Sequence, residues 1–257
     1  LSVSCGSSKK AIPQIKPSND NVTLTSTSTD FAFKTGAENF ESYLPLLKDK
    51  RVGIVTNQTG ILSKEKHLVD FLIEQNINLQ KIYAPEHGFR GTADAGELIV
   101  DGKDTKTNLP IISLYGNNKK PKPEQLEGID ILVFDLQDVG ARFYTYISSL
   151  HYVMEACAEN NIPLLVLDRP NPNGTIIDGP ILEKEHKSFV GMHEIPVLHG
   201  MTIGEYAKMI NGEKWLKDSL QCDLKVAPCL NYSHDMKYSL PVKPSPNLPN
   251  EQSINLY

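Results

Sequence analysis

Short runs of apolar residues alternate with stretches of helical periodicity along most of this 257-residue chain. The clearest apolar runs span residues 130–136 and 163–167, and residues 51–56 have the same character. Continuous apolar runs of this kind are typical of parallel strands that are covered on both faces. The alternation therefore predicts an α/β fold, in which a mostly parallel sheet carries helices on both faces.

Apolar runs and helical periodicity predict further strands and helices. The longest helix is expected over residues 144–160, where apolar residues recur at helical spacing. Thr202 and Glu205 have the spacing of a capping box and are expected to start a later helix. We also expect strands at 81–84 and 110–115, and helices at 67–74 and at 39–44, ahead of Pro45.

Composition divides the chain into three parts. Residues 1–35 are rich in Ser, Thr, Asn and Lys, and are predicted to be a lipoprotein-like N-terminus followed by a flexible tether. Residues 36–220 contain the alternating elements and are expected to form the main α/β domain. Residues 221–257 are expected to begin a smaller C-terminal domain that is truncated, because the chain stops at Tyr257 without a closing strand or helix.

The first residues, Leu1 to Gly6, resemble the end of a bacterial lipoprotein signal, with Cys5 as the residue that accepts the lipid. A charged segment and an apolar segment normally precede such a cysteine. This interpretation predicts a lipoprotein in the periplasm or at the cell surface, attached to the membrane only through its lipid. The alternative is an exposed cysteine in a disordered tail.

Charge and composition exclude several partners and cofactors. Lys and Arg number 26 against 31 Asp and Glu, and this mildly acidic balance argues against nucleic acid as a partner. No apolar run approaches the roughly 18 residues that indicate a membrane-spanning helix. The four cysteines form no Cys-x-x-Cys pair, and the glycine-rich motifs that bind dinucleotides or nucleotide phosphates are absent. We therefore expect no metal and no other cofactor.

Four polar clusters directly follow predicted strands. They span residues 84–91, 115–117, 137–144 and 168–174. Because the carboxyl ends of parallel strands lie at one edge of a sheet, these clusters are expected to converge on one crevice, where open α/β sheets bind their ligands. A loop that only turned the chain would not need so many functional side chains. We therefore interpret the chain as an enzyme.

The first cluster places a carboxyl, an imidazole and a guanidinium within five residues. Glu86 is the candidate general acid, because apolar neighbours such as Phe89 favour the protonated form of a carboxyl. The alternative is that Glu86 caps a turn or pairs with Arg90. His87 could orient Glu86, bind a hydroxyl of a substrate, or hydrogen-bond backbone carbonyls.

In the third cluster, Asp138 is the candidate second catalytic carboxylate, and Arg142 is a candidate for binding an anionic substrate group. The simpler alternative is an ion pair between the two, since they are four residues apart at a helix start. Tyr144 could line the binding site or pack against the helix. Asp135 lies within the apolar run and is expected to be a buried structural acid.

The fourth cluster contains two prolines, which stiffen the loop, and it offers Asp168, Arg169 and Asn171 to a substrate. A structural network around Asp168 and Arg169 is an equal alternative. His199 is a further candidate for substrate binding. It could instead join His193 in a metal site, but no metal-binding spacing supports that interpretation.

Several phrases of the sequence together resemble one known family. They are APEHGFRG, SLYG, VFDLQDVGARFYTYISSL, VLDRPNPNG, DGPILE, SFVGMHEIPVLHGMTIGE and PSPNLP. Their order and spacing are similar to those of the NamZ-type exo-β-N-acetylmuramidases, formerly a bacterial domain of unknown function. The resemblance runs from about residue 51 to the end of the chain. Members of the family continue into a Gly- and Thr-rich motif that this sequence lacks.

The resemblance implies a glycoside hydrolase of cell-wall recycling, which releases terminal β-1,4-linked N-acetylmuramic acid (MurNAc) from the non-reducing end of peptidoglycan fragments. It also implies a Rossmann-like larger domain, a smaller C-terminal domain and a site between them, with Glu86 as the catalytic acid. The substrate's lactyl carboxylate would suit an arginine, for which Arg90, Arg142 and Arg169 are candidates. Asp138 could orient the acetamido group, attack the sugar directly, or activate a water.

Two other functions fit the same residues. A lipoprotein-like start with an incomplete C-terminal part would suit a non-catalytic, surface-tethered binding protein for cell-wall fragments. Glu86 with the histidines at 87, 193 and 199 would suit a metal-dependent hydrolase. Turnover distinguishes the first alternative from a glycosidase, and the effect of a chelator distinguishes the second.

Overall fold

The computed structural model describes residues 32–62, 65–86, 88–89 and 101–257. Cys5 and nearly all of the predicted tether over residues 1–35 lie outside this part. His87 and Arg90 of the first polar cluster also lie outside it. Within the described residues, no helix is both long enough and apolar enough to cross a membrane.

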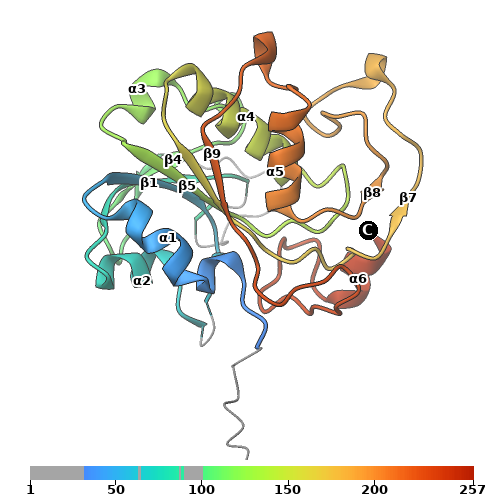
Figure 1. Cartoon of the computed structure of the whole chain (residues 1–257), viewed down its shortest axis with the longest axis horizontal. Helices are drawn as coiled ribbons and strands as arrows, with labels where there is room; N and C mark the ends of the chain where they lie inside the picture. The colour runs from blue at the N-terminus through green and yellow to red at the C-terminus, as the bar shows by residue number, and fades with distance from the viewer. Residues whose placement is uncertain (1–31, 63–64, 87, 90–100) are drawn as a thin grey trace, which may run out of the picture. The chain divides into compact units, whose positions relative to one another are not determined.

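A seven-stranded sheet forms the centre of the molecule (Figure 1). The strand order is β3-β4-β2-β1-β5-β6-β9, and every neighbouring pair is parallel except β3 with β4. The predicted mostly parallel α/β sheet is therefore confirmed. The strands are β1 (Arg51–Thr56), β2 (Asn78–Ala84), β3 (Gly102–Lys103), β4 (Pro110–Ser113), β5 (Ile131–Asp135), β6 (Leu164–Leu167) and β9 (Leu224–Ala227), and a separate antiparallel pair is formed by β7 (Ile177–Asp178) and β8 (Leu198–His199).

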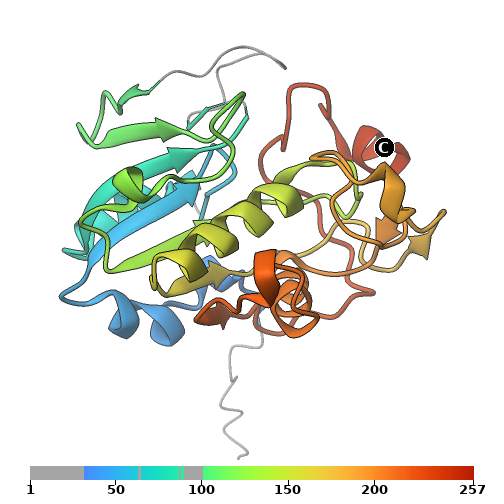
Figure 2. The ribbon, with the colours of Figure 1, turned by 90° about the horizontal axis from the view of Figure 1, so that it is seen from above.

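Helices cover both faces of the sheet (Figure 2). On one face, α1 and α2 pack through Tyr43, Leu47 and Leu68, which are fully buried. On the other face lie α4 and α5, with α4 running along the strands. The helices are α1 (Phe40–Leu47), α2 (Leu68–Glu74), α3 (Pro123–Leu126), α4 (Tyr146–Glu159), α5 (Ile203–Gly212) and α6 (Glu251–Leu256), with short 3₁₀ turns at Gly36–Glu38, Lys184–His186 and Lys217–Ser219.

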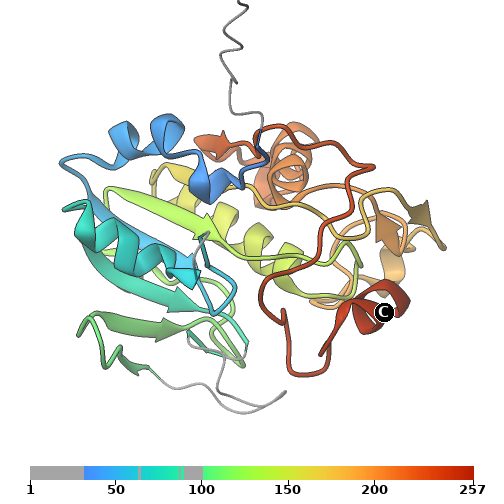
Figure 3. The same cartoon turned by 90° about the horizontal axis from the view of Figure 1, so that it is seen from below.

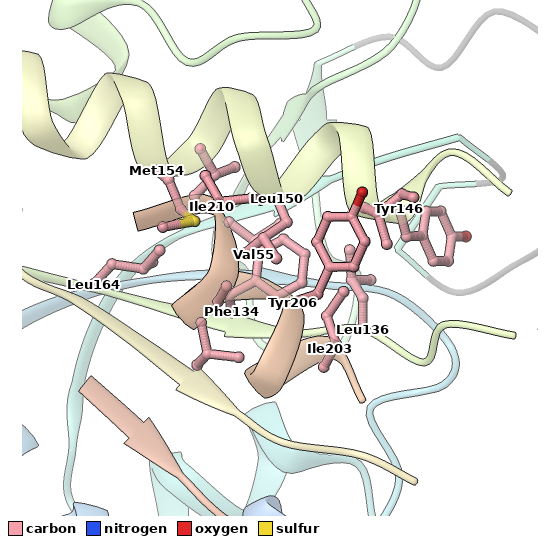
Figure 4. Close-up of a cluster of buried hydrophobic side chains, with 14 of the residues drawn as sticks. Val55, Phe134, Leu136, Tyr146, Leu150, Met154, Leu164, Ile203, Tyr206 and Ile210 are labelled. Atoms are coloured by element: carbon pink, nitrogen blue, oxygen red, sulfur yellow. The ribbon is translucent and has the colours of Figure 1, made fainter. Parts of the chain in front are cut away.

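The core on the α4 side holds the start of that helix in place (Figure 4). Phe134 of β5 and Leu164 of β6 meet Leu150 of α4 and Tyr206 of α5 in this core. Because successive strand residues point to opposite faces, Phe134 joins this core while its neighbour Val133 joins the other. Burial on both faces explains why β5 appears in the sequence as a continuous apolar run.

Two predicted boundaries are wrong. Helix α1 continues through Pro45, although proline removes a backbone donor, because Tyr43 and Leu47 are both buried and hold this turn against the sheet. Residues 224–227, expected in a separate domain that begins at 221, form β9 and pair in parallel with β6. The sheet therefore extends past residue 221, because β9 supplies its last strand.

After β9, the chain runs as an irregular segment to α6 (Figure 3). Gln58, which follows β1, donates to the carbonyl oxygens of Lys243 and Pro244. Asn173, which follows β6, donates to the carbonyl oxygen of Ile254. These contacts fix the C-terminal segment over the carboxyl ends of the central strands, where the polar clusters lie.

Candidate functional site

The carboxyl ends of β2 and β4 bring the first two polar clusters together. Glu86 follows β2 through Pro85, and Tyr115 follows β4. Since β2 and β4 are parallel neighbours, both residues leave the same edge of the sheet. The Tyr115 hydroxyl donates a hydrogen bond to Glu86 Oε1 at 3.1 Å.

Glu86 lines a cavity of about 240 Å³. Residues at the start of α4 form one wall of this cavity, and residues of the C-terminal segment form another. The lining consists of Glu86, Phe143, Tyr144, Thr145, Tyr146, Val190, Ser245, Asn247, Leu248 and Tyr257. Concave sites with aromatic and apolar walls and a few convergent polar groups are typical of small-ligand binding.

Two tyrosines hold the α4 wall in place. The Tyr144 hydroxyl donates to the Pro244 carbonyl oxygen at 2.8 Å, and its ring contacts Tyr146 edge-on with centroids 4.8 Å apart. The Tyr146 hydroxyl accepts a hydrogen bond from Asn57 Nδ2 at 2.7 Å. Burial raises the pKa of both phenols, so both stay protonated at neutral pH. Tyr144 lies at the cavity, and its contact with substrate stays a prediction.

Asp138 and His199 face each other in the interior, and each is only 3% exposed. Asp138 Oδ2 accepts a hydrogen bond from the Gly140 amide at 2.8 Å and lies 3.3 Å from His199 Nε2. His199 Nδ1 accepts from the Met201 amide, which leaves the proton of a neutral ring on Nε2, toward Asp138. Neither residue lines the Glu86 cavity. The catalytic role of Asp138 and the substrate role of His199 stay predictions.

Two of the candidate arginines bind groups inside the protein. Arg142 donates to the backbone carbonyl oxygens of Pro180 and Ile195. Arg169 is 2% exposed and forms a two-pronged ion pair with Asp135, with Nε–Oδ1 at 2.6 Å and Nη2–Oδ2 at 3.0 Å. A buried guanidinium needs such a partner, because an uncompensated buried charge is strongly destabilising. The structure thus places Arg169 in the core rather than at the cavity, and confirms Asp135 as a buried structural acid.

The fourth cluster ties β6 to the start of α5. Asp168 accepts hydrogen bonds from the Gly204 amide at 2.7 Å and from the Thr202 hydroxyl at 2.9 Å. Burial raises the pKa of Asp168 to about 6. Asn171 donates to the Met201 carbonyl oxygen at 2.9 Å. These contacts form a structural network around Asp168, and the substrate roles of Asp168 and Asn171 stay predictions.

Several residues at this site have no role in the sequence-based hypothesis. Tyr115, which contacts Glu86 without lining the cavity, lies in a strand-end cluster and has no assigned function there. The cavity residues Ser245, Asn247 and Tyr257 are likewise not among the predicted site residues. The hydrogen bond from Tyr144 to Pro244 spans 100 residues of sequence, so no local pattern could reveal it. The signals were the proline-rich stretch at 240–249, which forms no regular element up to α6, and the family phrase PSPNLP within it.

The metal-site alternative depends on histidines that have other partners in the described structure. His193 is hydrogen-bonded to His151 and to the Tyr206 hydroxyl, and His199 faces Asp138. Among the described residues, the group with ligand atoms close enough to hold a metal ion is the exposed set Glu183, Glu185 and His186. This set contains no residue of the Glu86 cavity.

Comparison with known proteins gives consistent matches. The family model described as exo-β-N-acetylmuramidase NamZ, N-terminal, matches residues 52–252. A relative from Bacillus subtilis (strain 168), named peptidoglycan β-N-acetylmuramidase NamZ, is 49% identical over 221 residues. The match covers 84% of this chain and 52% of the relative. The chain therefore spans about half the length of this relative.

Two crystal structures of DUF1343 family proteins from Bacteroides fragilis NCTC 9343 have a similar fold. The first is 50% identical with a TM-score of 0.80, and the match covers 88% of this chain and 60% of the other. The second is 41% identical with a TM-score of 0.79, and the match covers 86% of this chain and 57% of the other. Both support the α/β architecture described above.

Proposed function

We propose that this chain, which belongs to the NamZ family of exo-β-N-acetylmuramidases, acts as a glycoside hydrolase on peptidoglycan fragments. The reaction is the release of terminal β-1,4-linked MurNAc from the non-reducing end. The observation that carries this proposal is Glu86, which lies at a strand end on the wall of a tyrosine-lined cavity. The name of the Bacillus subtilis relative supports the same reaction.

In this proposal Glu86 is the general acid. It gives its proton to the glycosidic oxygen while the bond to the anomeric carbon breaks. Because the Tyr115 hydroxyl donates to Oε1, the proton of the acid form would sit on Oε2. Tyr115 would thereby fix which oxygen of Glu86 delivers the proton.

The new bond at the anomeric carbon needs a nucleophile. Asp138 is paired with buried His199 and does not line the cavity. This placement favours attack by the carbonyl oxygen of the substrate's own acetamido group, followed by hydrolysis of the resulting ring. Arg90, which lies outside the described residues, is the candidate for the lactyl carboxylate, because Arg142 and Arg169 already bind internal groups.

The test is release of free MurNAc from a MurNAc-terminated disaccharide by the full-length protein, measured by chromatography. Glu86→Gln keeps the shape of the side chain but removes the proton donor, and should lower turnover by about 10²- to 10⁴-fold. The matched control is Glu124→Gln in α3, which should keep normal turnover. Near-normal turnover by Glu86→Gln would exclude Glu86 as the acid. An inactive wild type, tested at several pH values, would contradict the proposed hydrolase.

We also propose that Cys5 carries a lipid anchor and that the protein acts in the periplasm or at the cell surface. The lipoprotein-like sequence around Cys5 and the location of peptidoglycan outside the cytoplasmic membrane support this proposal. Labelled fatty acid should be incorporated into the full-length protein in bacteria, and Cys5→Ser should abolish the incorporation. Equal labelling of the two proteins would contradict the anchor.

A further inference from the structure

A second cavity, of about 620 Å³, lies beside the Glu86 cavity. The adjacent residues Phe189 and Val190 line the two cavities, Phe189 the second and Val190 the first. Helix α4 also contributes to both, through Tyr146 to the first and Tyr152 to the second. Six residues of helix correspond to about 9 Å along its axis. A single extended ligand could therefore occupy both cavities.

The base of the second cavity contains two buried histidines whose ring nitrogens have protein partners. His193 Nε2 lies 2.9 Å from His151 Nδ1, and His193 Nδ1 lies 2.8 Å from the Tyr206 hydroxyl. His151 Nε2 lies 3.6 Å from a carboxylate oxygen of Glu155. Burial lowers the pKa of both histidines, that of His193 to about 3. These rings are therefore neutral near pH 7 and present a rigid surface rather than a charge.

Aromatic rings form much of the wall. The Trp215 ring stacks on His193 with centroids 4.6 Å apart and an interplanar angle of 19°. The Tyr152 and Phe189 rings stack on each other at 5.9 Å and 10°. Stacking fixes the orientation of these rings before any ligand arrives, which lowers the entropic cost of binding. The wall thus suits a ligand with a flat apolar face.

Two charged residues line the cavity, Lys187 and Glu194. They form an ion pair at 2.8 Å with both side chains exposed, so together they add no net charge. The pair can donate to and accept from neutral hydroxyl groups, but its lysine is already neutralised by a carboxylate. A ligand whose recognition depended on its own carboxylates would have to compete with Glu194 for Lys187.

We propose that this second cavity is a saccharide-binding subsite, which holds a neutral pyranose of the glycan chain whose terminal sugar occupies the Glu86 cavity. One face of a pyranose presents C–H groups that pack on aromatic rings, while its edge presents hydroxyl and amide groups to a polar rim. The choice of a peptidoglycan glycan as ligand rests on the proposed function. A stem peptide fits less well, because its carboxylates would have to displace Glu194 from Lys187, the lysine that lines this cavity.

Trp215 is the only tryptophan in the chain, so intrinsic fluorescence reports on this cavity directly. The probe is the β-1,4-linked tetramer of N-acetylglucosamine, which has no terminal MurNAc and is not a substrate of the proposed reaction. Titration of the full-length wild type should give a saturable fluorescence change with a millimolar dissociation constant. The peptide L-Ala-γ-D-Glu-L-Lys-D-Ala should give no saturable change.

Two variants assign the signal to the cavity. Tyr152→Ala removes one aromatic face and should weaken binding of the tetramer by about tenfold, from the loss of buried apolar area. Lys187→Ala removes a rim donor and should weaken binding by a few-fold. The matched control is Lys184→Ala, an exposed lysine three residues away that does not line the cavity and should bind as wild type does. Thermal melting confirms that each variant is folded.

The inference is overturned if the wild type shows no saturable change, if the tetrapeptide but not the tetramer produces one, or if neither Tyr152→Ala nor Lys187→Ala weakens the response. If Tyr152→Ala does not fold, Lys187→Ala and the wild-type titration decide. Failure of the proposed function is a separate result, because the probe is not cleaved. Release of MurNAc without a fluorescence response refutes only the subsite, and a response without release of MurNAc refutes only the hydrolase.

Discussion

Two carboxyl groups that follow strands of the sheet, Glu86 after β2 and Asp168 after β6, have different surroundings. Glu86 lines a cavity and receives a hydrogen bond from the Tyr115 hydroxyl. Asp168 is 6% exposed and accepts hydrogen bonds from Thr202 and Gly204 of the α5 N-terminus. Since a catalytic acid must reach its substrate, the environment of Glu86 is compatible with proton transfer and that of Asp168 favours a structural role.

The Tyr115–Glu86 hydrogen bond predicts a specific change in turnover. Tyr115→Phe should lower kcat for the MurNAc-terminated disaccharide by about tenfold, because the carboxyl loses a group that orients it. KM should change little, because Tyr115 does not line the Glu86 cavity.

The measurement is kcat and KM for wild type and variant. The matched control is Tyr238→Phe, since Tyr238 is a partly buried tyrosine that does not line the Glu86 cavity. A kcat that stays at the wild-type value, or a change confined to KM, would show that Tyr115 does not act through Glu86.

Among the secondary-structure elements, the junction of β6 and α5 depends on a close approach between the α5 backbone and the Asp168 side chain. The Asp168 carbonyl oxygen accepts from the Gly36 amide at 2.7 Å, while the Asp168 side chain caps α5. A Cβ added to Gly204 would lie 2.7 Å from Asp168 Cγ, so glycine is required for this approach. Asp168 therefore joins the 3₁₀ turn at 36–38, β6 and α5.

The junction predicts that Asp168 acts mainly on stability. Asp168→Ala should lower the free energy of unfolding by about 1–3 kcal/mol, because the Gly204 amide and the Thr202 hydroxyl lose a buried acceptor. Asp168→Asn retains one acceptor oxygen and should cost less. Both effects are measured by urea denaturation, and the release of MurNAc per folded molecule should stay near the wild-type value. A stable Asp168→Asn protein without activity would instead support the predicted contact of Asp168 with substrate.

For the whole molecule, contacts between distant segments determine the response to acid. The hydrogen-bonded histidines His151 and His193 join α4 to the loop before β8, and Tyr206 of α5 completes the network. Burial lowers the pKa of His193 to about 3 and also lowers that of His151. Burial raises the pKa of Asp168 to about 6. The free energy of unfolding therefore gains a contribution from Asp168 as the pH falls, whereas it loses one from the histidines.

The histidine network predicts a loss of stability below about pH 6.5. An unfolded histidine binds a proton near pH 6.5, whereas folded His193 stays neutral until about pH 3, so the unfolded state takes up more protons between these values. The free energy of unfolding should therefore fall as the pH decreases from about 6.5 toward 3. Denaturation midpoints between pH 7 and pH 4 measure this decrease.

The variant His193→Phe separates the histidine contribution from that of the carboxyl groups. It should be less stable than wild type at pH 7, because the Tyr206 hydroxyl and the His151 ring lose a partner. Its stability should then change less than that of wild type between pH 7 and pH 4. An equal or steeper decrease in the variant would show that His193 is not the group responsible.

Much of the architecture could be predicted because strand and helix periodicity is a local property. The expected strand at 130–136 is β5, Ile131–Asp135, and the expected helix at 144–160 is α4, Tyr146–Glu159. The expected boundary at 221 was wrong, because the pairing of residues 224–227 with β6 is a long-range contact that no local pattern shows.

The candidate site was predictable only in part. Position after a strand placed Glu86 and Tyr144 at the cavity, since parallel strands bring their carboxyl ends together. Whether a polar side chain is free to bind a ligand depends instead on its hydrogen-bond and ion-pair partners, which lie far away in the sequence. Arg169 is occupied by Asp135, 34 residues away, and the cavity is closed by Ser245 and Tyr257 of the C-terminal segment. Such pairings arise only from packing, so the tertiary structure alone decided which polar residues face a substrate and which hold the fold together.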